Sequence, residues 1–314
     1  MEAWRALVRG ITSILVTEDS RLLMDSTRNQ RTIAGPALVE GFGYWDGKDV
    51  RVQFRPADVN TGIVFVRSDL AGCPRIPAHV CYRVEQPRRI SLRRDGAGVE
   101  MIEHVMAALA GLWIDNCEIW VDRHEMPGCD GSALPFVRAL DAAGIVEQDA
   151  PKQKRIVREV IRLGDGESWF DARPSRSGEM VLKYYLDYGP EGPIGRQTFR
   201  ISPTPESFRT ELAPCRTFLL KSDADRLLAR GLGRRATCQD LLVFGDDGPI
   251  GNRLRFPDEC VRHKILDMLG DLALAGCDLV GRFSAYKSGH RLNAEMVRAL
   301  TSQSGRVGLW RRCA

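Results

Sequence analysis

Residues 261–272 constrain the fold most, because they can form a helix with two different faces. The apolar residues of this segment recur at helical spacing and share one side at about 100° per residue: Val261, Ile265, Met268, Leu269 and Leu272. His263, Asp267 and Asp271 follow at intervals of four and stack along the other side. An imidazole one helical turn from a carboxylate can supply two ligands to the same metal ion. The segment therefore predicts a packed helix and a hydrolytic metal site, with a polar surface helix as the alternative.

Length and composition are those of an ordinary globular protein. The chain has 314 residues, enough for two domains, with 44% hydrophobic and 27% charged residues. A net charge of +4 is too small to argue for nucleic acid. No run approaches the ~20 apolar residues that cross a bilayer, so we expect no stable membrane insertion. The first residues show no signal peptide, which predicts a cytoplasmic protein.

The nine cysteines do not form a recognisable pattern. They are odd in number, scattered from Cys73 to Cys313, and contain no CxxC pair. This spacing suits neither a disulfide framework nor a cysteine-rich zinc site. We therefore expect reduced thiols, many of them buried.

Alternating and helical patterns predict an α+β protein. Strands are predicted at 51–55, 61–66, 117–121, 155–161 and 180–186. Helices are predicted at 102–112, 132–143, 205–212, 261–271 and 293–302, the second capped by the turn 130–132. Both halves read as strands, helix, strand, helix, which predicts two similar domains, each a β-sheet layered with α-helices. The active site is expected at their interface.

A charged stretch at 147–154 breaks the pattern and is the expected domain boundary. The first domain is then 30–150 and the second 151–314. Residues 1–29 are an N-terminal extension, for which a disordered tail and a short amphipathic surface helix are the two interpretations.

Two further histidines are candidates for the same site. Zinc hydrolases usually offer three protein ligands, and only five histidines are present. His104 follows Glu103 at the head of a predicted helix, which would place a ligand beside a carboxylate base. His290 ends the glycine-containing turn 286–290, where a flexible backbone could present an imidazole to a cleft. Sequence spacing alone cannot show whether His104 and His290 lie near His263 and Asp267 in the folded protein.

Five blocks of sequence, in order, resemble the UDP-3-O-acyl-N-acetylglucosamine deacetylases, the zinc amidases of lipid A synthesis. The first is EHVMAALAGL with IDN, within 103–116, and the second is DGSA with PFV, within 130–137. The third is RTF at 216–218. The fourth lies within 256–271 and keeps HKxLDxxGD, and the fifth is FSAYKSGHxLN at 283–293.

This resemblance implies a role for each matched residue. A Zn²⁺ ion would have three ligands: His104, His263 and Asp267. Glu103 would be the general base, and Thr217 would donate a hydrogen bond to the oxyanion. His290, kept protonated by Asp271, would stabilise that charge and protonate the leaving amine, and Lys264 would face the anionic part of the substrate. The same donor set would accept Fe²⁺ or Co²⁺.

The implied substrate is a UDP-linked N-acetylglucosamine with a 3-O-hydroxyacyl chain, and the implied products are acetate and the free amine. We expect a monomer that acts on this small molecule. The resemblance implies an insert near 73–98 and an acyl-chain insert near 218–244. Leu227 and Leu228 would line the acyl passage, or else pack the insert onto its domain. Asp187 and Tyr188 would lie near the uracil, although Tyr188 also reads as an ordinary strand-end tyrosine. Phe218, beside Thr217, completes the expected substrate contacts.

Three segments depart from the family pattern, all in substrate recognition. Ser168 stands where familiar members carry a lysine. Arg234 and Arg235 replace a small glycine-rich turn, and would reshape the passage or remain in solvent. The basic stretch 81–89 would supply a phosphate contact or be a solvated charge run. Two alternatives therefore remain: a related metal amidase for another acylated amino sugar, and a catalytically silent nucleotide-sugar-binding paralogue.

Overall fold

Two sheets with the same strand order form the framework of the protein, seen here in a computed structural model that describes residues 28–302. The first sheet has the order β2 (Ala37–Phe42), β3 (Asp49–Pro56), β9 (Cys117–Val121), β4 (Ile63–Arg67) and β5 (Arg75–Pro77). The second has the order β12 (Ile161–Gly164), β13 (Trp169–Arg173), β19 (Asp278–Tyr286), β14 (Met180–Asp187) and β15 (Arg196–Ile201). A short strand, β11 (Lys154–Ile156), also pairs with β19.

The strand directions match as well as the order. The central strand of each sheet, β9 or β19, is antiparallel to one neighbour and parallel to the other. Two other antiparallel pairs complete each sheet, β2–β3 and β4–β5 in the first, β12–β13 and β14–β15 in the second. The duplication suggested by the order of elements in the sequence is therefore present as a repeated topology.

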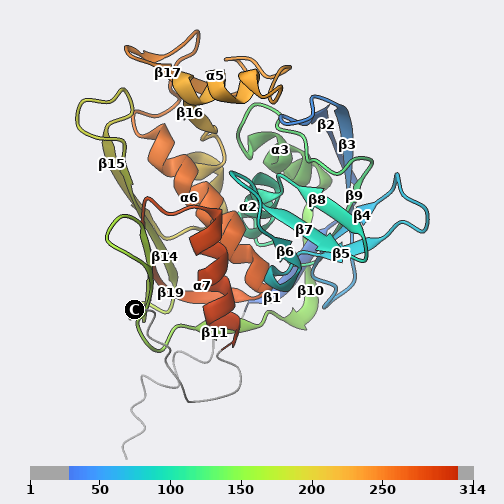
Figure 1. The fold of residues 1–314 in the computed structure, drawn as a ribbon. Coiled ribbons are helices and arrows are strands. Elements are labelled where there is room, and N and C mark those ends of the chain that lie inside the picture. Colours follow the sequence, from blue (N-terminus) through green and yellow to red (C-terminus); the bar gives the residue numbers. More distant parts are fainter. Residues whose placement is uncertain (1–27, 303–314) are drawn as a thin grey trace, which may run out of the picture.

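The helices lie between the two sheets (Figure 1). They are α2 (Glu103–Gly111), α3 (Leu134–Ala143), α6 (Glu259–Leu272) and α7 (His290–Ser302). Helix α6 contacts α2, α7 and β14, and all but two of its residues are buried. The helix has the predicted apolar and polar sides, but its polar side does not face solvent. The histidine and aspartate stripe faces α2 and α7, so it is buried too.

Helices α2 and α6 approach closely at Gly270. A Cβ atom added there would lie 2.2 Å from the carbonyl oxygen of Glu103 and 3.1 Å from the backbone nitrogen of Ala107. Both atoms belong to the backbone of α2, so neither can move aside without shifting the helix. A residue without a side chain at this position thus brings the first turn of α2 against the last turn of α6.

Gly270→Ala is therefore expected to force the two helices apart and to lower the free energy of unfolding by about 1–3 kcal/mol. The same shift should weaken metal binding, which can be measured by zinc content alongside chemical denaturation. Gly35→Ala is the control, because a Cβ there meets no atom within 4 Å. Equal stability and equal zinc in the two variants would contradict this account of Gly270.

Two smaller sheets lie outside the framework. One is formed by β6 (Arg83–Val84), β7 (Ser91–Arg94) and β8 (Ala97–Glu100), preceded by the one-turn helix η1 (Val80–Tyr82). The other is formed by β16 (Phe218–Leu220), β17 (Leu242–Gly245) and β18 (Gly248–Pro249). Helix α5 (Lys221–Ala229), which the sequence patterns did not predict, connects β16 to β17, and these elements lie over one end of the central helices (Figure 1). The expected insert near 73–98 overlaps β5, which belongs to the first large sheet.

The charged stretch at 147–154 was expected to interrupt regular structure, and this is wrong. It lies mostly in β10 (Ile145–Pro151), which pairs with β1 (Asn29–Ile33) in a two-stranded ribbon. Most side chains of β10 are exposed or half-buried, so charged residues there reach water and do not oppose a strand. Gln148 faces the protein and accepts a hydrogen bond from Asn116.

Three other boundaries differ from the predictions. Helix α3 begins at Leu134, because Asp130 accepts hydrogen bonds from Ser132 and holds residues 130–132 as a turn ahead of it. The single strand predicted at 155–161 is divided between β11 and β12, which pair with different partners. Helix α7 begins at His290, three residues earlier than predicted.

The remaining predicted helix, 205–212, is present as one α-helical turn, α4 (Pro205–Ser207), that continues into a π-helical turn, η2 (Phe208–Leu212). A further short helix, η3 (Ala273–Ala275), follows α6. Within residues 28–302, none of the helices has the length and apolar character needed to span a bilayer. The eight cysteines of this part of the chain are free. Except for Arg28 and Asn29, the N-terminal extension expected at 1–29 lies outside the described residues.

Candidate active site

Helices α2 and α6 bring the three expected metal ligands together. His104 is the second residue of α2, and His263 and Asp267 lie one turn apart on α6. The ligand atoms of the three residues all lie within 4.8 Å of one another, and all three side chains are buried. The Oδ1 atom of Asp267 is 3.7 Å from Nε2 of His104 and 3.4 Å from Nε2 of His263. Two imidazole nitrogens and one carboxylate oxygen at this spacing could hold a metal ion.

Both histidines are neutral, as metal ligands must be. Burial lowers the pKa of His263, and burial together with the neighbouring His263 lowers the pKa of His104 to about 3. The Nδ1 atom of His263 lies 3.0 Å from the carbonyl oxygen of Cys215 and donates to it. This hydrogen bond leaves the lone pair on Nε2, which faces the other two ligands.

The third ligand is held as a carboxylate. Burial would raise the pKa of Asp267, but the charge of Lys264, with that of the protonated His290, brings it below its ordinary range. The Nζ atom of Lys264 lies 2.6 Å from Oδ2, on the side away from the histidines. Asp267 therefore presents an ionised Oδ1 to His104 and His263 while Lys264 compensates its other oxygen.

Thr217 lies directly over the ligands. Its Oγ1 atom is 3.1 Å from Nε2 of His263 and 3.3 Å from Nε2 of His104. Its backbone nitrogen donates to the carbonyl of Gly131 at 2.7 Å, which ties this residue to the turn before α3. A hydroxyl fixed at this point can donate to an oxygen atom bound beside the ligands.

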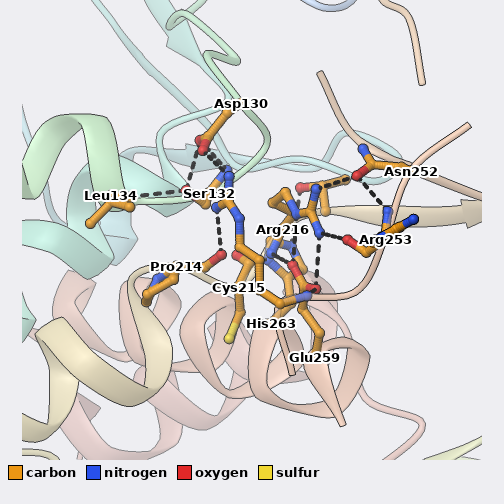
Figure 2. Close-up of polar contacts among 12 residues, drawn as sticks. Asp130, Ser132, Leu134, Pro214, Cys215, Arg216, Asn252, Arg253, Glu259 and His263 are labelled. Atoms are coloured by element: carbon orange, nitrogen blue, oxygen red, sulfur yellow. Dashed lines mark hydrogen bonds and ion pairs between the residues drawn. The ribbon is translucent and has the colours of Figure 1, made fainter. Parts of the chain in front are cut away.

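A buried ion pair holds the segment that carries Cys215 and Thr217. Nε of Arg216 lies 2.8 Å from Oε1 of Glu259, and the same oxygen accepts the backbone N–H of Arg216. The guanidinium also donates to Asn252 and to the carbonyl of Arg253 (Figure 2). Because this network fixes residues on both sides of Arg216, it positions the carbonyl that orients His263. The sequence motif contained Arg216, but nothing in the sequence identified Glu259 as its partner.

Glu103 lies beside the ligands with only 3% of its surface exposed. Its Oε2 atom accepts the backbone N–H of Ile90 at 3.0 Å. Burial raises its pKa to about 7, with the nearby charge of His290 acting in the opposite direction. A carboxyl group with a pKa near neutrality is suited to take up and release a proton. The contact with Ile90 could not be predicted from the sequence, because it comes from the loop before β7.

His290 stands on the first turn of α7 above a buried carboxylate. Its Nδ1 atom is 2.9 Å from Oδ2 of Asp271, which is fully buried and also accepts from Nδ2 of Asn293 at 2.7 Å. Ser288 donates to Asn293 in turn, so the carboxylate is held from a second side. Burial lowers the pKa of His290, but the charge of Asp271 overcomes this and raises it to about 9. The imidazole is therefore a cation at neutral pH.

These groups line one end of a cavity of about 1000 Å³. Its lining includes the three ligands, Glu103, Thr217, Lys264 and His290. One wall of the remainder is apolar and is formed largely by the small sheet β16–β18 and its helix: Leu227, Leu228, Leu232, Leu241, Val243 and Ile250. Charged residues such as Lys221, Lys287 and Arg291 line other parts of the cavity. The structure thus places a polar reaction centre and an apolar chamber in one continuous space.

Only some of the residues expected to contact the substrate line the cavity. Phe218 and Tyr188 line the cavity, with ring centroids 5.9 Å apart, and Phe218 lies 6.2 Å from the ring of His263. Asp187 does not belong to the lining. Its carboxylate pairs with Arg196 and accepts the hydroxyl of Tyr286, while Ser168 lies on the cavity wall without a charge.

The arginines of the departing segments are largely engaged within the protein. Arg235 lies 2.6 Å from Asp49 and packs over the ring of Phe42. Nη2 of Arg88 lies 3.4 Å from Oδ1 of Asp223 on α5, which links the two small sheets across the cavity. Arg89 pairs with Glu100 at 2.7 Å and packs over Trp45. The interpretation of 81–89 as a solvated charge run is therefore wrong for Arg89, whereas Arg88 remains exposed to solvent.

Comparison with known proteins agrees with the arrangement of the site. Residues 30–302 match the family model described as UDP-3-O-acyl N-acetylglycosamine deacetylase. Proteins named UDP-3-O-acyl-N-acetylglucosamine deacetylase from Brucella ovis, Brucella canis and Brucella abortus are each 40% identical over 276 residues, which cover 87% of this chain and 95% of theirs. The match includes every residue of the candidate site. The chain therefore belongs to the UDP-3-O-acyl-N-acetylglycosamine deacetylase family.

Proposed function

We propose that this protein hydrolyses the acetamide of UDP-3-O-(hydroxyacyl)-N-acetylglucosamine to the free amine and acetate, a step of lipid A biosynthesis. One observation carries the proposal. A buried ligand triad, a carboxyl base and a histidine cation converge at the end of a cavity that also has an extended apolar wall. Family membership supplies the identity of the substrate.

We propose Zn²⁺ as the metal, held by His104, His263 and Asp267. The donor set fits, because two neutral imidazoles and a carboxylate are typical of catalytic zinc sites. When bound, zinc would supply a Lewis acid that polarises the amide carbonyl and makes water a stronger acid.

Glu103 is the general base of this proposal. Its Oε2 atom is occupied by the N–H of Ile90, so Oε1 is the atom that accepts the proton of the attacking water. Because the side chain is buried beside the ligands, this proton transfer occurs away from bulk solvent.

His290 and Thr217 act on the charge that the attack creates. The imidazolium of His290 stabilises the developing oxyanion and then gives its proton to the leaving amine. The Oγ1 hydroxyl of Thr217 donates a second hydrogen bond. Asp271 keeps His290 protonated without itself reaching the cavity.

The wider cavity suggests how the substrate is oriented. Leu227 and Leu228 line the apolar part and are proposed to contact the acyl chain. Phe218 and Tyr188 place aromatic rings near the reaction centre, suited to the sugar and the uracil. Lys264 is proposed to face the anionic part of the substrate. Asp187 is proposed to assist from the strand end, through Tyr286 and the adjacent Tyr188.

The repeated topology also supports the expected division of the chain. We propose a first α+β domain at 30–150 and a second at 151–314, with the reaction centre between their equivalent helices α2 and α6. The two small sheets are proposed as inserts of these domains.

The direct test is an acetate-release assay on the UDP-linked acylated sugar, with elemental analysis of the same sample. We expect acetate to form in proportion to bound zinc, at about one ion per chain. Zinc-loaded protein that binds the sugar without releasing acetate would instead identify a silent binding paralogue.

The alkaline limit of this activity is expected to depend on Asp271. His290 must be protonated, and its pKa is raised to about 9, so kcat/KM should fall as the pH rises through about 9. Asp271→Asn removes the charge that raises this pKa, and the limit should move to lower pH by at least about one unit. The measurement is the pH dependence of kcat/KM for both proteins. If the alkaline limit of kcat/KM were the same in both proteins, His290 would not be the general acid.

A related amidase that acts on another acylated amino sugar remains the second candidate. It is favoured by one observation: the wall is uncharged at Ser168, where familiar members carry a lysine, and Arg88 is engaged by Asp223. A panel of N-acetylated sugars with and without UDP distinguishes the two. Turnover of the sugar lacking UDP, with none of the UDP form, would establish the alternative.

A further inference from the structure

A hollow on the outer face of the second sheet is lined by cations and contains no acidic residue. Its volume is about 480 Å³, and its lining shares no residue with the cavity of the reaction centre. The cations come from three neighbouring strands and the loop between β13 and β14: Arg176, Lys183, Arg200 and Arg282. We refer to these four residues as the cation cluster.

The pleat of the sheet directs the cluster away from the core. Leu182 and Tyr184 on β14 are buried toward the helices, so Lys183 between them points to the opposite face. Arg282 on β19 and Arg200 on β15 are exposed on that same face, while Phe283 is fully buried. The cluster is therefore open to solvent on a surface that the reaction centre does not use.

The pairing of the strands puts like charges directly opposite one another. Lys183 is the cross-strand partner of Arg200, and Arg173 is the partner of Arg282. Cross-strand cations repel each other and destabilise a sheet. An arrangement that costs stability in the free protein is explained if an anion is bound there.

No acidic side chain in residues 28–302 neutralises the cluster. The side chains of its four members have neither an ion-pair partner nor a hydrogen-bond partner within this part of the chain, although Lys183 lies over the ring of Tyr185. Asp171, on the same face, is nearly buried and pairs with Arg173 and Arg162. Asp187, farther along β14, pairs with Arg196.

The other polar residues of the hollow are hydroxyl donors. Ser175 and Ser177 belong to the loop that carries Arg176, and Ser284 is the cross-strand partner of Lys183 on β19. Arginine forks, a lysine and hydroxyl groups around a shallow hollow match the oxygens of a phosphate group.

We propose that this hollow binds a phosphate-bearing ligand at a site separate from the reaction centre. The ligand is a free phosphorylated small molecule or the headgroup of an anionic lipid, which share the same chemistry. The site does not depend on the deacetylase function, so either can fail without the other.

The test uses the full chain and two probes, inorganic pyrophosphate and vesicles of phosphatidylglycerol in phosphatidylcholine. Binding of pyrophosphate is measured by calorimetry, and vesicle binding by co-sedimentation. The hollow variant is Arg200→Gln with Arg282→Gln. Its matched control, Arg162→Gln with Arg196→Gln, removes the same charge from the same face outside the hollow. Lys287→Gln removes a cation from the wall of the large cavity and reports any binding there.

We expect at least one probe to bind the wild type, with affinity about tenfold weaker for each arginine removed from the hollow. The control pair and Lys287→Gln should bind as the wild type does. Pyrophosphate binding would indicate a free ligand, and binding of vesicles alone would indicate a headgroup; both support the site. The hollow variant should also melt at a higher temperature than the wild type without ligand, because repulsion is relieved.

Three results would overturn the proposal. They are failure of both probes to bind the wild type, equal binding by the hollow variant, and loss of binding in Lys287→Gln rather than in the hollow variant. Acetate release by the hollow variant is expected to be unchanged and serves as the measure of intact folding.

Discussion

Glu103→Gln is expected to lower kcat/KM by a factor of about 10²–10⁴ while the protein keeps its zinc, because the amide cannot accept a proton from water. The substitution preserves the rest of the site. The side-chain oxygen of glutamine can still accept the N–H of Ile90, which Glu103 accepts at 3.0 Å. The measurements are acetate release and zinc content on the same preparation.

Glu103→Ala provides the comparison that separates chemistry from folding. It loses the same base and also leaves the buried N–H of Ile90 without an acceptor, at a cost of about 1–3 kcal/mol in unfolding free energy. The two variants should thus share a low rate and differ in stability. Full activity in either one would exclude Glu103 as the base.

His263→Ala is expected to abolish metal binding and with it all measurable acetate release. The substitution removes one of three ligands and leaves Asp267 and His104 with no third donor at the same point. Losing one of three ligands lowers affinity far more than losing an outer hydrogen bond, whose removal costs about 10–100-fold. Zinc content after dialysis against a weak chelator, followed by the activity assay, measures both effects.

A second histidine offers a matched control. His124 also belongs to a group that could hold a metal ion, with Asp46 and Glu125, but 46% of its side chain is exposed. His124→Ala should retain zinc and activity. If His124→Ala lost the zinc and His263→Ala kept it, the metal site would have been assigned to the wrong histidines.

Local patterns predicted the central elements well. The helical period at 261–272 and the alternation at 51–55 and 117–121 recur as α6, β3 and β9, because both periods follow from backbone geometry alone. Helix α5 was missed for a related reason. None of its residues is buried in the core, and Leu227 and Leu228 face the cavity, so it has no apolar stripe to detect.

The candidate site was predictable in its residues rather than in its geometry. The spacing of His263 and Asp267 indicated a pair of ligands, and the sequence blocks identified His104, Glu103 and His290. No spacing rule could bring α2 against α6, because their approach depends on Gly270 lying against the backbone of Glu103. The supporting contacts from Ile90 and Cys215 come from loops, and that from Glu259 comes from the first residue of α6; none of these positions carries a periodic signal.

By itself the sequence determined the family, the α+β class, the principal helices and strands, and the residues able to take part in the reaction. These depend on local periodicity and on residue identity, both of which are written along the chain. Only the tertiary structure decided that two imidazoles and a carboxylate meet, that burial moves the pKa of Glu103 toward neutrality, and that four cations gather on the outer face of the second sheet. Those properties arise from distances and desolvation between segments far apart in the chain, which no local pattern contains.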